Sequence, residues 1–185
     1  MEPKPQATFP FKRHPSTSPF ILTVRDFLAE RPNAGYKLIG TDALVFDRST
    51  PDPRILLVQR AGHDSMPNRW EAPGGGCDAE DESILHGVAR ELWEETGLRA
   101  TEIGPVVGEP NVFTSRSGKE IGKFHFMVQV EKGEGPLEVK LDPEEHQQWV
   151  WASEEEVKAK KVGGIELEFT TENMENMVLE SFKQV

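Results

Sequence analysis

The alternation of apolar and polar residues predicts the strands of this chain. In the segment "KFHFMVQV", residues 123–130, Phe124 and Phe126 alternate with polar residues, and only Met127 interrupts the pattern. A period of two is typical of a strand with one buried face. Apolar runs bounded by turn residues predict further strands at 37–46, 54–60, 101–108 and 148–152. The glycine- and proline-rich stretches 62–81 and 110–119 are expected to be loops.

A period of three to four residues predicts the helices. The segment 18–29 has Ser18 as its N-cap and Pro19 at its first helical position. Further helices are expected at 82–96, at "EEEVKAKK" after Ser153, and at 171–183. Glu156 follows Ser153 by three residues, so the two are expected to form a capping box. Strands interleaved with helices predict an α/β or α+β domain with a mixed sheet.

The predicted helix at 82–96 changes character along its apolar stripe. At about 100° per residue, the stripe consists of Ile84, Leu85, Val88 and Leu92. Glu95 and Glu91 project within about 20° and about 60° of Val88, whereas Glu94 lies on the flank at about 120°. The stripe is therefore apolar for its first turns and carries carboxylates at its C-terminal end.

Carboxylates at this end of a helix are electrostatically unfavourable. The helix dipole prefers cations there by about 0.3–1 kcal/mol. Two like charges about 4 Å apart repel by about 4 kcal/mol at an effective dielectric constant of about 20. An ion pair between Arg90 and Glu94 returns only about 0.3–0.5 kcal/mol. A solvated helix face explains the composition but not the placement, whereas a divalent cation such as Mg²⁺ explains both, because it binds carboxylates, water and phosphates.

Three consecutive glycines precede this helix, in the segment "APGGGCDAEDE" at 72–82. Glycine lets the backbone adopt positive φ and approach a ligand closely, and it leaves peptide groups exposed as ligands. Taken alone, the run is equally well interpreted as a flexible turn. Directly before the acidic helix, it predicts a second side for a metal site.

Composition narrows the setting of the domain. The 185 residues, 36% of them apolar, suffice for one core, and the chain lacks an apolar run long enough to span a membrane. Residues 1–19 contain five prolines and are expected to form a disordered or extended tail before a single domain at 20–185. A net charge of −11 argues against a nucleic-acid polymer as partner. The single Cys77 is expected to be an inert thiol in a reducing, cytoplasmic setting.

A motif of 23 residues joins the glycine run to the acidic helix. From Gly76 the sequence reads "GCDAEDESILHGVARELWEETGL". Every fixed position matches the Nudix box, so the chain resembles the Nudix hydrolases, MutT-like members included. The segments "LLVQRA", "RWEAPGG" and "PEEHQQWVWASEEE" also resemble the family, over about residues 37–160. The resemblance implies an α/β fold, an α/β/α sandwich with a mixed central sheet, to which this chain adds helices near both ends.

The resemblance also implies a chemistry. It implies Mg²⁺ or Mn²⁺ as cofactor and hydrolysis of a pyrophosphate bond in a small molecule, a nucleoside diphosphate linked to another moiety. The metal ligands would be Glu91, Glu94 and Glu95. Arg90 would hold a glutamate in place, and Glu82 would be a supporting carboxylate. Gly97 would end the helix, which its position also suggests. A homodimer is compatible with these features.

Two assignments within the site stay open. Three glycines follow Pro73 where many family members have two, so the metal-binding carbonyl belongs to Gly75 or Gly74, with Gly75 favoured. The general base lies in the box, as Glu91, or on a later loop. The loop candidates are Glu120, Glu144 and Glu145, each of which is also explained as a surface charge.

Several residues outside the box are candidates for substrate binding. For phosphates these are Arg54, Arg60 and Arg69, and for stacking on a base they are Trp70, Phe113 and Phe124. A surface charge is the favoured explanation for each single arginine, and core or lid packing explains each aromatic residue at least as well. His125 is expected either in a cleft or on the surface.

These features together predict a metal-dependent nucleotide pyrophosphatase. The alternative is a catalytically weak sensor or scaffold that binds a nucleotide, but the intact glutamates argue against it. A prenyl diphosphate isomerase of the same fold would need a catalytic cysteine, and Cys77 lies in the wrong loop. The substrate is left open, although "WEAPGG" favours the MutT-like group that hydrolyses nucleoside triphosphates.

Overall fold

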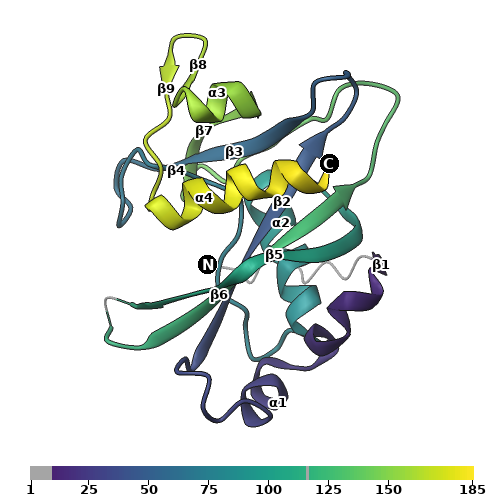
Figure 1. Cartoon of the computed structure of the whole chain (residues 1–185), viewed down its shortest axis with the longest axis vertical. Coiled ribbons are helices and arrows are strands. Elements are labelled where there is room, and N and C mark those ends of the chain that lie inside the picture. The colour runs from purple at the N-terminus through teal and green to yellow at the C-terminus, as the bar shows by residue number, and fades with distance from the viewer. Residues whose placement is uncertain (1–9, 116) are drawn as a thin grey trace.

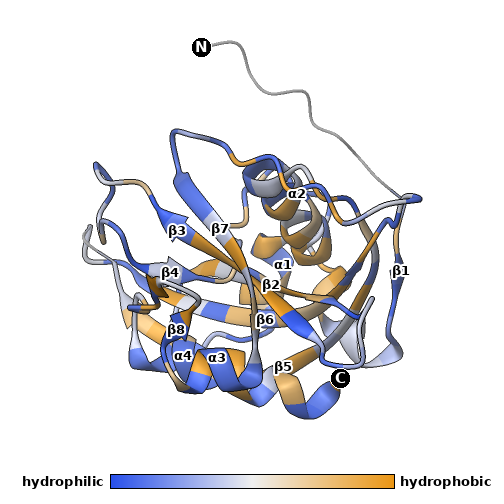
Figure 2. Ribbon diagram, turned by 90° about the horizontal axis from the view of Figure 1, so that it is seen from above, coloured by the Kyte–Doolittle hydropathy of each residue, from blue (hydrophilic) through white to orange (hydrophobic). Residues whose placement is uncertain are grey.

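Helices lie on both faces of a central mixed sheet (Figures 1 and 2). The computed structural model describes residues 10–115 and 117–185. The strands are β1 (Lys12–Arg13), β2 (Leu38–Asp47), β3 (Arg54–Arg60), β4 (Trp70–Glu71), β5 (Ala100–Thr114), β6 (Glu120–Val130), β7 (His146–Ser153), β8 (Lys161–Val162) and β9 (Ile165–Glu166). The helices are α1 (Val24–Ala29), α2 (Ile84–Thr96), α3 (Glu154–Lys158) and α4 (Glu172–Ser181), with 3-10 helices η1 (Pro15–Ile21) and η2 (Phe182–Gln184). The layers confirm the predicted α/β/α sandwich.

Strand β2 is the centre of the sheet. It pairs in parallel with β6 from Leu38 to Val45, and β5 and β1 extend the sheet beyond β6. On its other side β2 pairs with β3 only at Phe46 and Asp47. Strand β3 pairs in turn with β4 and β7. The first part of β2 therefore has an edge that β3 does not cover.

The glycine-rich segment 73–77 lies along that edge of β2. The N–H groups of Thr41 and Ala43 donate to the carbonyls of Gly75 and Pro73, each at 2.8 Å. These bonds hold the glycine run extended against the sheet. They also decide which of its peptide groups face the rest of the site.

The pleat of the central strands divides the interior into two apolar cores. Along β2, Ala43 and Val45 pack on the α2 side, whereas Leu44 and Phe46 pack on the α4 side. Figure 2 shows α1 and α2 on one side of the sheet and α3 and α4 on the other. Strand β6 is buried on both faces, which explains why Met127 interrupts the expected alternation.

Most predicted elements are confirmed within a few residues. They include the strands at 37–46, 54–60, 123–130 and 148–152, the helix at 82–96, the last helix, and the capping box of Ser153 and Glu156. The prediction of one helix at 18–29 was wrong, because this segment contains the end of η1 followed by a separate helix, α1. Thr23, rather than Ser18, accepts a hydrogen bond from the Asp26 N–H and caps α1.

Two stretches expected to be loops contain strands. β4 lies within 62–81, and β5 runs through Pro110 to Thr114 because β6 is long enough to pair with it there. The β8–β9 hairpin was not predicted. Of the expected tail, residues 10–19 include β1 and most of η1, whereas residues 1–9 lie outside the described residues. Among the described helices, none is long and apolar enough to cross a membrane.

Candidate metal centre

Helix α2 presents the acidic residues to one place. Its first turn is capped by Ser83, whose hydroxyl accepts a hydrogen bond from the His86 N–H. Its end is set by Gly97, which has a φ of 70° and donates its N–H to the Trp93 carbonyl at 2.8 Å, as predicted. The predicted stripe is fully buried: Ile84, Leu85, Val88 and Leu92. Glu95 continues this stripe into the protein.

The three box glutamates differ in their surroundings. The Glu95 side chain is almost completely buried, and its Oε2 accepts a hydrogen bond of 2.7 Å from the Gly74 N–H. Burial raises the pKa of Glu95 well above its ordinary value, and the charge of Glu91 adds to this effect. Burial also raises the pKa of Glu91 to about 7, against the opposing influence of Arg90. Glu94 is the most exposed of the three, at 21% of its side chain.

Arg90 ties these acids to the preceding loop. Its guanidinium donates to both carboxylate oxygens of Asp81, at 2.9 Å each, and to the Gly76 carbonyl at 2.9 Å. It also donates to Glu91 at 2.8 Å and to Glu94 at 3.2 Å. Five donor contacts from one buried side chain fix the loop and the helix relative to each other.

The carboxylate that pairs with Arg90 from the loop is Asp81, not Glu82. Asp81 is 5% exposed, whereas the Glu82 side chain is 67% exposed and lies 3.6 Å from His86. The supporting role that the family resemblance implied for Glu82 is therefore corrected.

The glycine run lies directly against the acids. A methyl group on Gly75 would lie 2.6 Å from Glu91 Oε2, and a side chain on Gly74 would collide with the Thr41 carbonyl. The Pro73 and Gly75 carbonyls both face β2, so the N–H and carbonyl groups of Gly74 face the opposite way. The hydrogen bond that the Gly74 N–H donates to Glu95 agrees with this direction. Cys77 follows this run, and burial raises the pKa of its thiol to about 12, as expected for an inert thiol.

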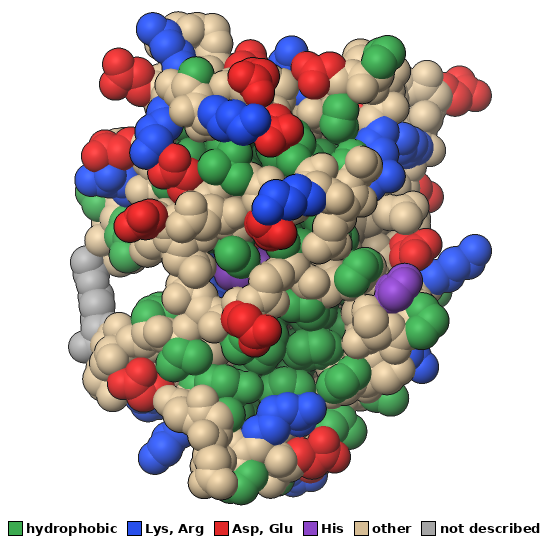
Figure 3. Space-filling model, in the orientation of Figure 1, with side chains coloured by type: hydrophobic (Ala, Val, Ile, Leu, Met, Phe, Trp, Pro, Cys, Tyr) green, Lys and Arg blue, Asp and Glu red, His purple; other side chains and the backbone are tan. Residues whose placement is uncertain are grey.

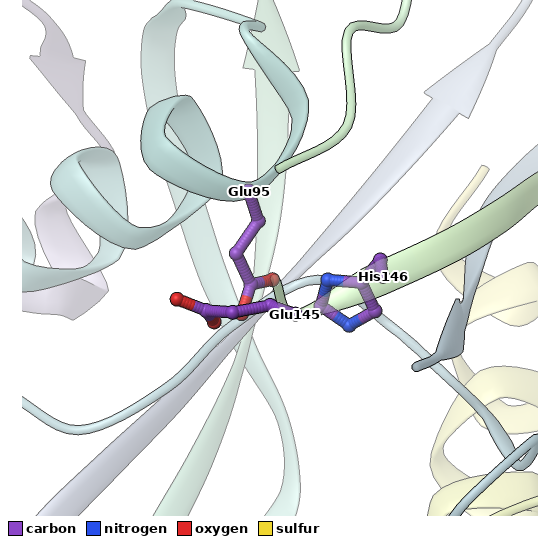
Figure 4. A group of neighbouring side chains, drawn as sticks. All are labelled: Glu95, Glu145 and His146. Atoms are coloured by element: carbon purple, nitrogen blue, oxygen red, sulfur yellow. The ribbon is translucent and has the colours of Figure 1, made fainter. Parts of the chain in front are cut away.

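The opposite side of the site is formed by β3, β4 and the start of β7. Arg60 donates to Glu71 at 2.6 Å and to Asp64 at 2.5 Å, and Glu71 lies 3.5 Å from His146 Nε2. Figure 4 shows Glu95 reaching from α2 toward Glu145 and His146. The ligand atoms of these three side chains lie within 4.8 Å of one another. Of the loop candidates for a general base, Glu145 is thus brought beside the box glutamates.

A second buried charge cluster lies behind the glycine run. Asp42 on β2 is completely buried, with Lys123 Nζ 2.6 Å away and His125 Nδ1 2.8 Å away. Lys123 lowers the pKa of Asp42 against the effect of burial. A side chain on Gly74 would also contact Asp42. Sequence reasoning missed Asp42 and Lys123, and it left His125 undecided, because their proximity follows from the parallel register of β2 and β6.

The predicted substrate-binding residues are scattered. Arg60 lies at the site, but Arg54 pairs with Glu156 beside α3 at 3.5 Å. Arg69 pairs with Glu168 and lines a separate cavity of about 920 Å³ next to α4. Two of the aromatic candidates, Trp70 (0% exposed) and Phe124 (6%), are packed in the cores, which corrects their stacking role. Phe113 is 40% exposed on the β5–β6 hairpin.

Figure 3 shows the face that the site opens onto. The surface is hollowed between the part that carries β3, β4 and β7 and the β5–β6 hairpin, and a histidine side chain is visible inside the hollow. The site therefore combines a recessed space, several buried carboxylates and a few buried cations. Such a combination suits a compact anionic ligand together with a divalent cation.

Comparison with known proteins agrees with this geometry. A family model, the NUDIX domain, matches residues 37–172. The CTP pyrophosphohydrolase of Escherichia coli is 35% identical over 122 residues, 65% of this chain and 79% of that protein. An m7GpppN-mRNA hydrolase of Homo sapiens is 38% identical over 104 residues, 52% of this chain and 29% of that protein. The chain spans less than half the length of several curated relatives that it matches.

Solved structures share the fold. The MutT protein from Methanosarcina mazei Go1 is 28% identical, with a TM-score of 0.58 over 80% of this chain and 93% of that one. The NUDIX domain of Shewanella oneidensis NrtR, in complex with ADP ribose, has a TM-score of 0.60 over 88% of this chain and 99% of that one. At 20% identity, the latter similarity concerns the fold alone.

Proposed function

The chain belongs to the Nudix family, and from this premise we propose that it is a metal-dependent hydrolase that cleaves a pyrophosphate bond in a nucleoside diphosphate linked to another moiety. One observation carries the proposal. The buried carboxylate of Glu95 accepts a hydrogen bond from the extended glycine segment, and the Glu91 carboxylate lies against the same segment. Relatives named as pyrophosphohydrolases support the same reaction class.

The residues present fit a divalent cation. Glu91 and Glu95 repel each other, burial disfavours both charges, and a cation in this space would relieve both effects. The proposed ligands are Glu91, Glu94 and Glu95, together with a backbone carbonyl. The Gly75 carbonyl accepts a hydrogen bond from the Thr41 N–H. We therefore assign this role to the carbonyl of Gly74, the other glycine that the sequence left open. When bound, Mg²⁺ or Mn²⁺ would neutralise phosphate charge and lower the pKa of a coordinated water.

The protein's own residues would orient the substrate and deprotonate the attacking water. Arg90 fixes the side chains of Glu91 and Glu94, so that their oxygens need no reorganisation when a ligand enters. Glu145 is solvent-exposed beside Glu95, and its carboxylate can accept a proton from an attacking water. Arg60, on the opposite side of the site, and Lys123, beside Asp42, are two further cations near this group. They would bind and orient the anionic substrate.

The substrate class rests on the relatives. Two of them are named a CTP pyrophosphohydrolase and an RNA pyrophosphohydrolase, so their names describe cleavage of a pyrophosphate bond in a nucleotide or in RNA. A net charge of −11 favours the small nucleotides over a polymer. The similarity to a MutT protein and to CTP pyrophosphohydrolase supports nucleoside triphosphates as the first candidates.

The test is a substrate panel. Nucleoside triphosphates, oxidised nucleotides, nucleotide sugars, dinucleotides and coenzyme A are incubated with Mg²⁺ or Mn²⁺, and released phosphate or mononucleotide is measured. Glu94→Gln is assayed beside the native protein, because the glutamine keeps the shape and removes the charge. We expect turnover of at least one compound and its loss in the variant. Binding of a nucleotide without turnover of any compound would support the sensor, a role described for an ADPR-responsive repressor that is 26% identical over 127 residues.

A further inference from the structure

His146, the first residue of β7, is buried at the edge of the acidic site. It is 3% exposed, and neither of its ring nitrogens makes a hydrogen bond within the part of the chain that the structure describes. Leaving such a group without a partner costs about 1–3 kcal/mol. A buried imidazole whose ring nitrogens make no hydrogen bond among the described residues is therefore able to bind a ligand.

A strand irregularity brings His146 into this position. Gln148 pairs with Gln59, but the next pair joins His146 to Arg60, so Gln147 is an additional residue on β7. A bulge of this kind re-aims the neighbouring side chain. The exposed Gln147 instead donates to Gln59 and Asn68. The bulge thus separates an outward-facing Gln147 from an inward-facing His146.

Glu71 is placed to orient the imidazole ring. Its Oε1 lies 3.5 Å from His146 Nε2 and accepts a hydrogen bond of 2.6 Å from Arg60. Figure 4 shows the other ring nitrogen of His146 on the side that faces Glu95. A carboxylate at one imidazole nitrogen, with the second nitrogen left to bind, is the arrangement that proteins use around histidine metal ligands.

We propose that His146 is a ligand of a divalent cation, together with Glu95 and Glu145. Their ligand atoms lie within 4.8 Å of one another. Two ligands of one ion lie at most about 4.4 Å apart, twice a metal–ligand bond of about 2.2 Å. The exposed Glu145 side chain is free to rotate toward the other two. The inference extends the proposed function and rests on it for the presence of a divalent cation in this cleft.

A nitrogen ligand changes the choice of metal. Mg²⁺ prefers oxygen ligands, whereas imidazole favours transition metals such as Zn²⁺ and is accepted by Mn²⁺ and Co²⁺. Sites formed only by carboxylates and a carbonyl do not make this distinction. This position would therefore bind Mn²⁺, Co²⁺ or Zn²⁺ in preference to Mg²⁺. The glutamates nearer the glycine run would offer a cation only oxygen ligands.

The test measures the metal directly, with Mn²⁺ alone as the probe. The full chain is loaded with one equivalent of Mn²⁺, and electron spin-echo modulation detects whether an imidazole ¹⁴N nucleus is coupled to the ion. We expect this modulation in the native protein. Its absence there would overturn the proposal without any variant, so a variant that fails to fold does not leave the question undecided.

Two variants identify the histidine. His146→Gln is expected to abolish the imidazole modulation and to weaken Mn²⁺ binding about 10–100-fold, as measured by titration calorimetry. His63→Gln is the matched control, because His63 is exposed and its Nε2 lies 3.0 Å from the Glu144 carbonyl, on the same loop as Glu145. This control is expected to keep both the modulation and the affinity. Modulation that survives in His146→Gln, or disappears in His63→Gln, would contradict the assignment.

The outcomes for metal binding and for hydrolysis are separate. Imidazole coupling without turnover of any nucleotide would support the metal ligand and contradict the proposed activity. Turnover without imidazole coupling would support the activity and contradict His146 as a ligand. Circular dichroism of each variant verifies that the fold is retained.

Discussion

The site has two walls that are built in different ways. The helix wall consists of residues 73–82 and α2, and the contacts of Arg90 that join its two parts arise within one short stretch of chain. The strand wall consists of Arg60 on β3, Glu71 on β4, Glu145 just before β7, and His146 at the start of β7. Each wall is organised by one largely buried arginine, Arg90 in the helix wall and Arg60 in the strand wall.

The difference lies in what positions the side chains. In the helix wall, the spacing along α2 places Glu91 and Glu95 on one face, and Arg90 connects them to the loop just before. In the strand wall, the pairing of β3 with β4 and β7, and the bulge beside Arg60, bring the residues together. We therefore expect the helix wall to carry the reaction and the strand wall to tune it.

The largest expected effect compares one carboxylate from each wall. Glu95→Gln should lower kcat about 10²–10³-fold, because it removes a buried charge from the proposed metal site. Glu71→Gln should lower kcat about 10-fold, because Glu71 acts only through His146. Both are measured by steady-state kinetics on a substrate found in the panel. Equal losses in the two variants would mean that the walls are not functionally distinct.

The next effect concerns the helix wall without metal. In EDTA, Glu91 has a pKa of about 7 in the folded protein, above its ordinary value of 4.5. The folded protein then binds a proton that the unfolded chain has released, so stability falls as pH rises from about 4.5 to about 7. The loss is at most about 3.5 kcal/mol, since one pKa unit equals about 1.4 kcal/mol. Glu95 acts in the same direction.

Chemical unfolding at pH 5 and pH 8 measures this loss. Mn²⁺ should reduce the difference in unfolding free energy between the two pH values, and so should Glu91→Gln in EDTA. A protein in EDTA that is more stable at pH 8 than at pH 5 would contradict the raised pKa.

A smaller effect tests which acid supports Arg90. Asp81→Asn should destabilise the protein by about 1–3 kcal/mol, because the buried Asp81 accepts two hydrogen bonds from Arg90. Glu82→Gln should change stability by less than about 0.5 kcal/mol, because its side chain is exposed. Denaturant unfolding compares the two neighbours directly. The opposite ranking would restore Glu82 to the role that the family resemblance implied.

The smallest effect is expected outside both walls. Arg54→Ala removes an arginine that pairs with Glu156 and is 42% exposed, so stability should fall by less than about 1 kcal/mol. The kcat and KM values should stay within about twofold, because Arg54 does not lie at the site. A large rise in KM would show that substrate extends along β3 as far as α3.

Local sequence patterns were sufficient to predict the arrangement of the helix wall. The stripe on α2, the misplaced carboxylates, Gly97 as the helix end and the glycine run before it all follow from periods and preferences that act over a few residues. The same local rules identified most strands and the capping box at Ser153. Even here, Asp81 rather than Glu82 pairs with Arg90, because spacing alone does not say which residue of a loop turns inward.

The strand wall, and the buried cluster of Asp42 and Lys123 behind the glycine run, follow from the tertiary structure alone. Glu71 lies in a stretch that was predicted to be a loop. His146 lies at the start of a strand, and no local sequence pattern indicated that its side chain faces inward. Asp42 and Lys123 meet only because β2 and β6 are parallel neighbours, although about eighty residues separate them in the chain. Pairing between distant strands depends on register, and a single bulge reverses which side chain faces the site.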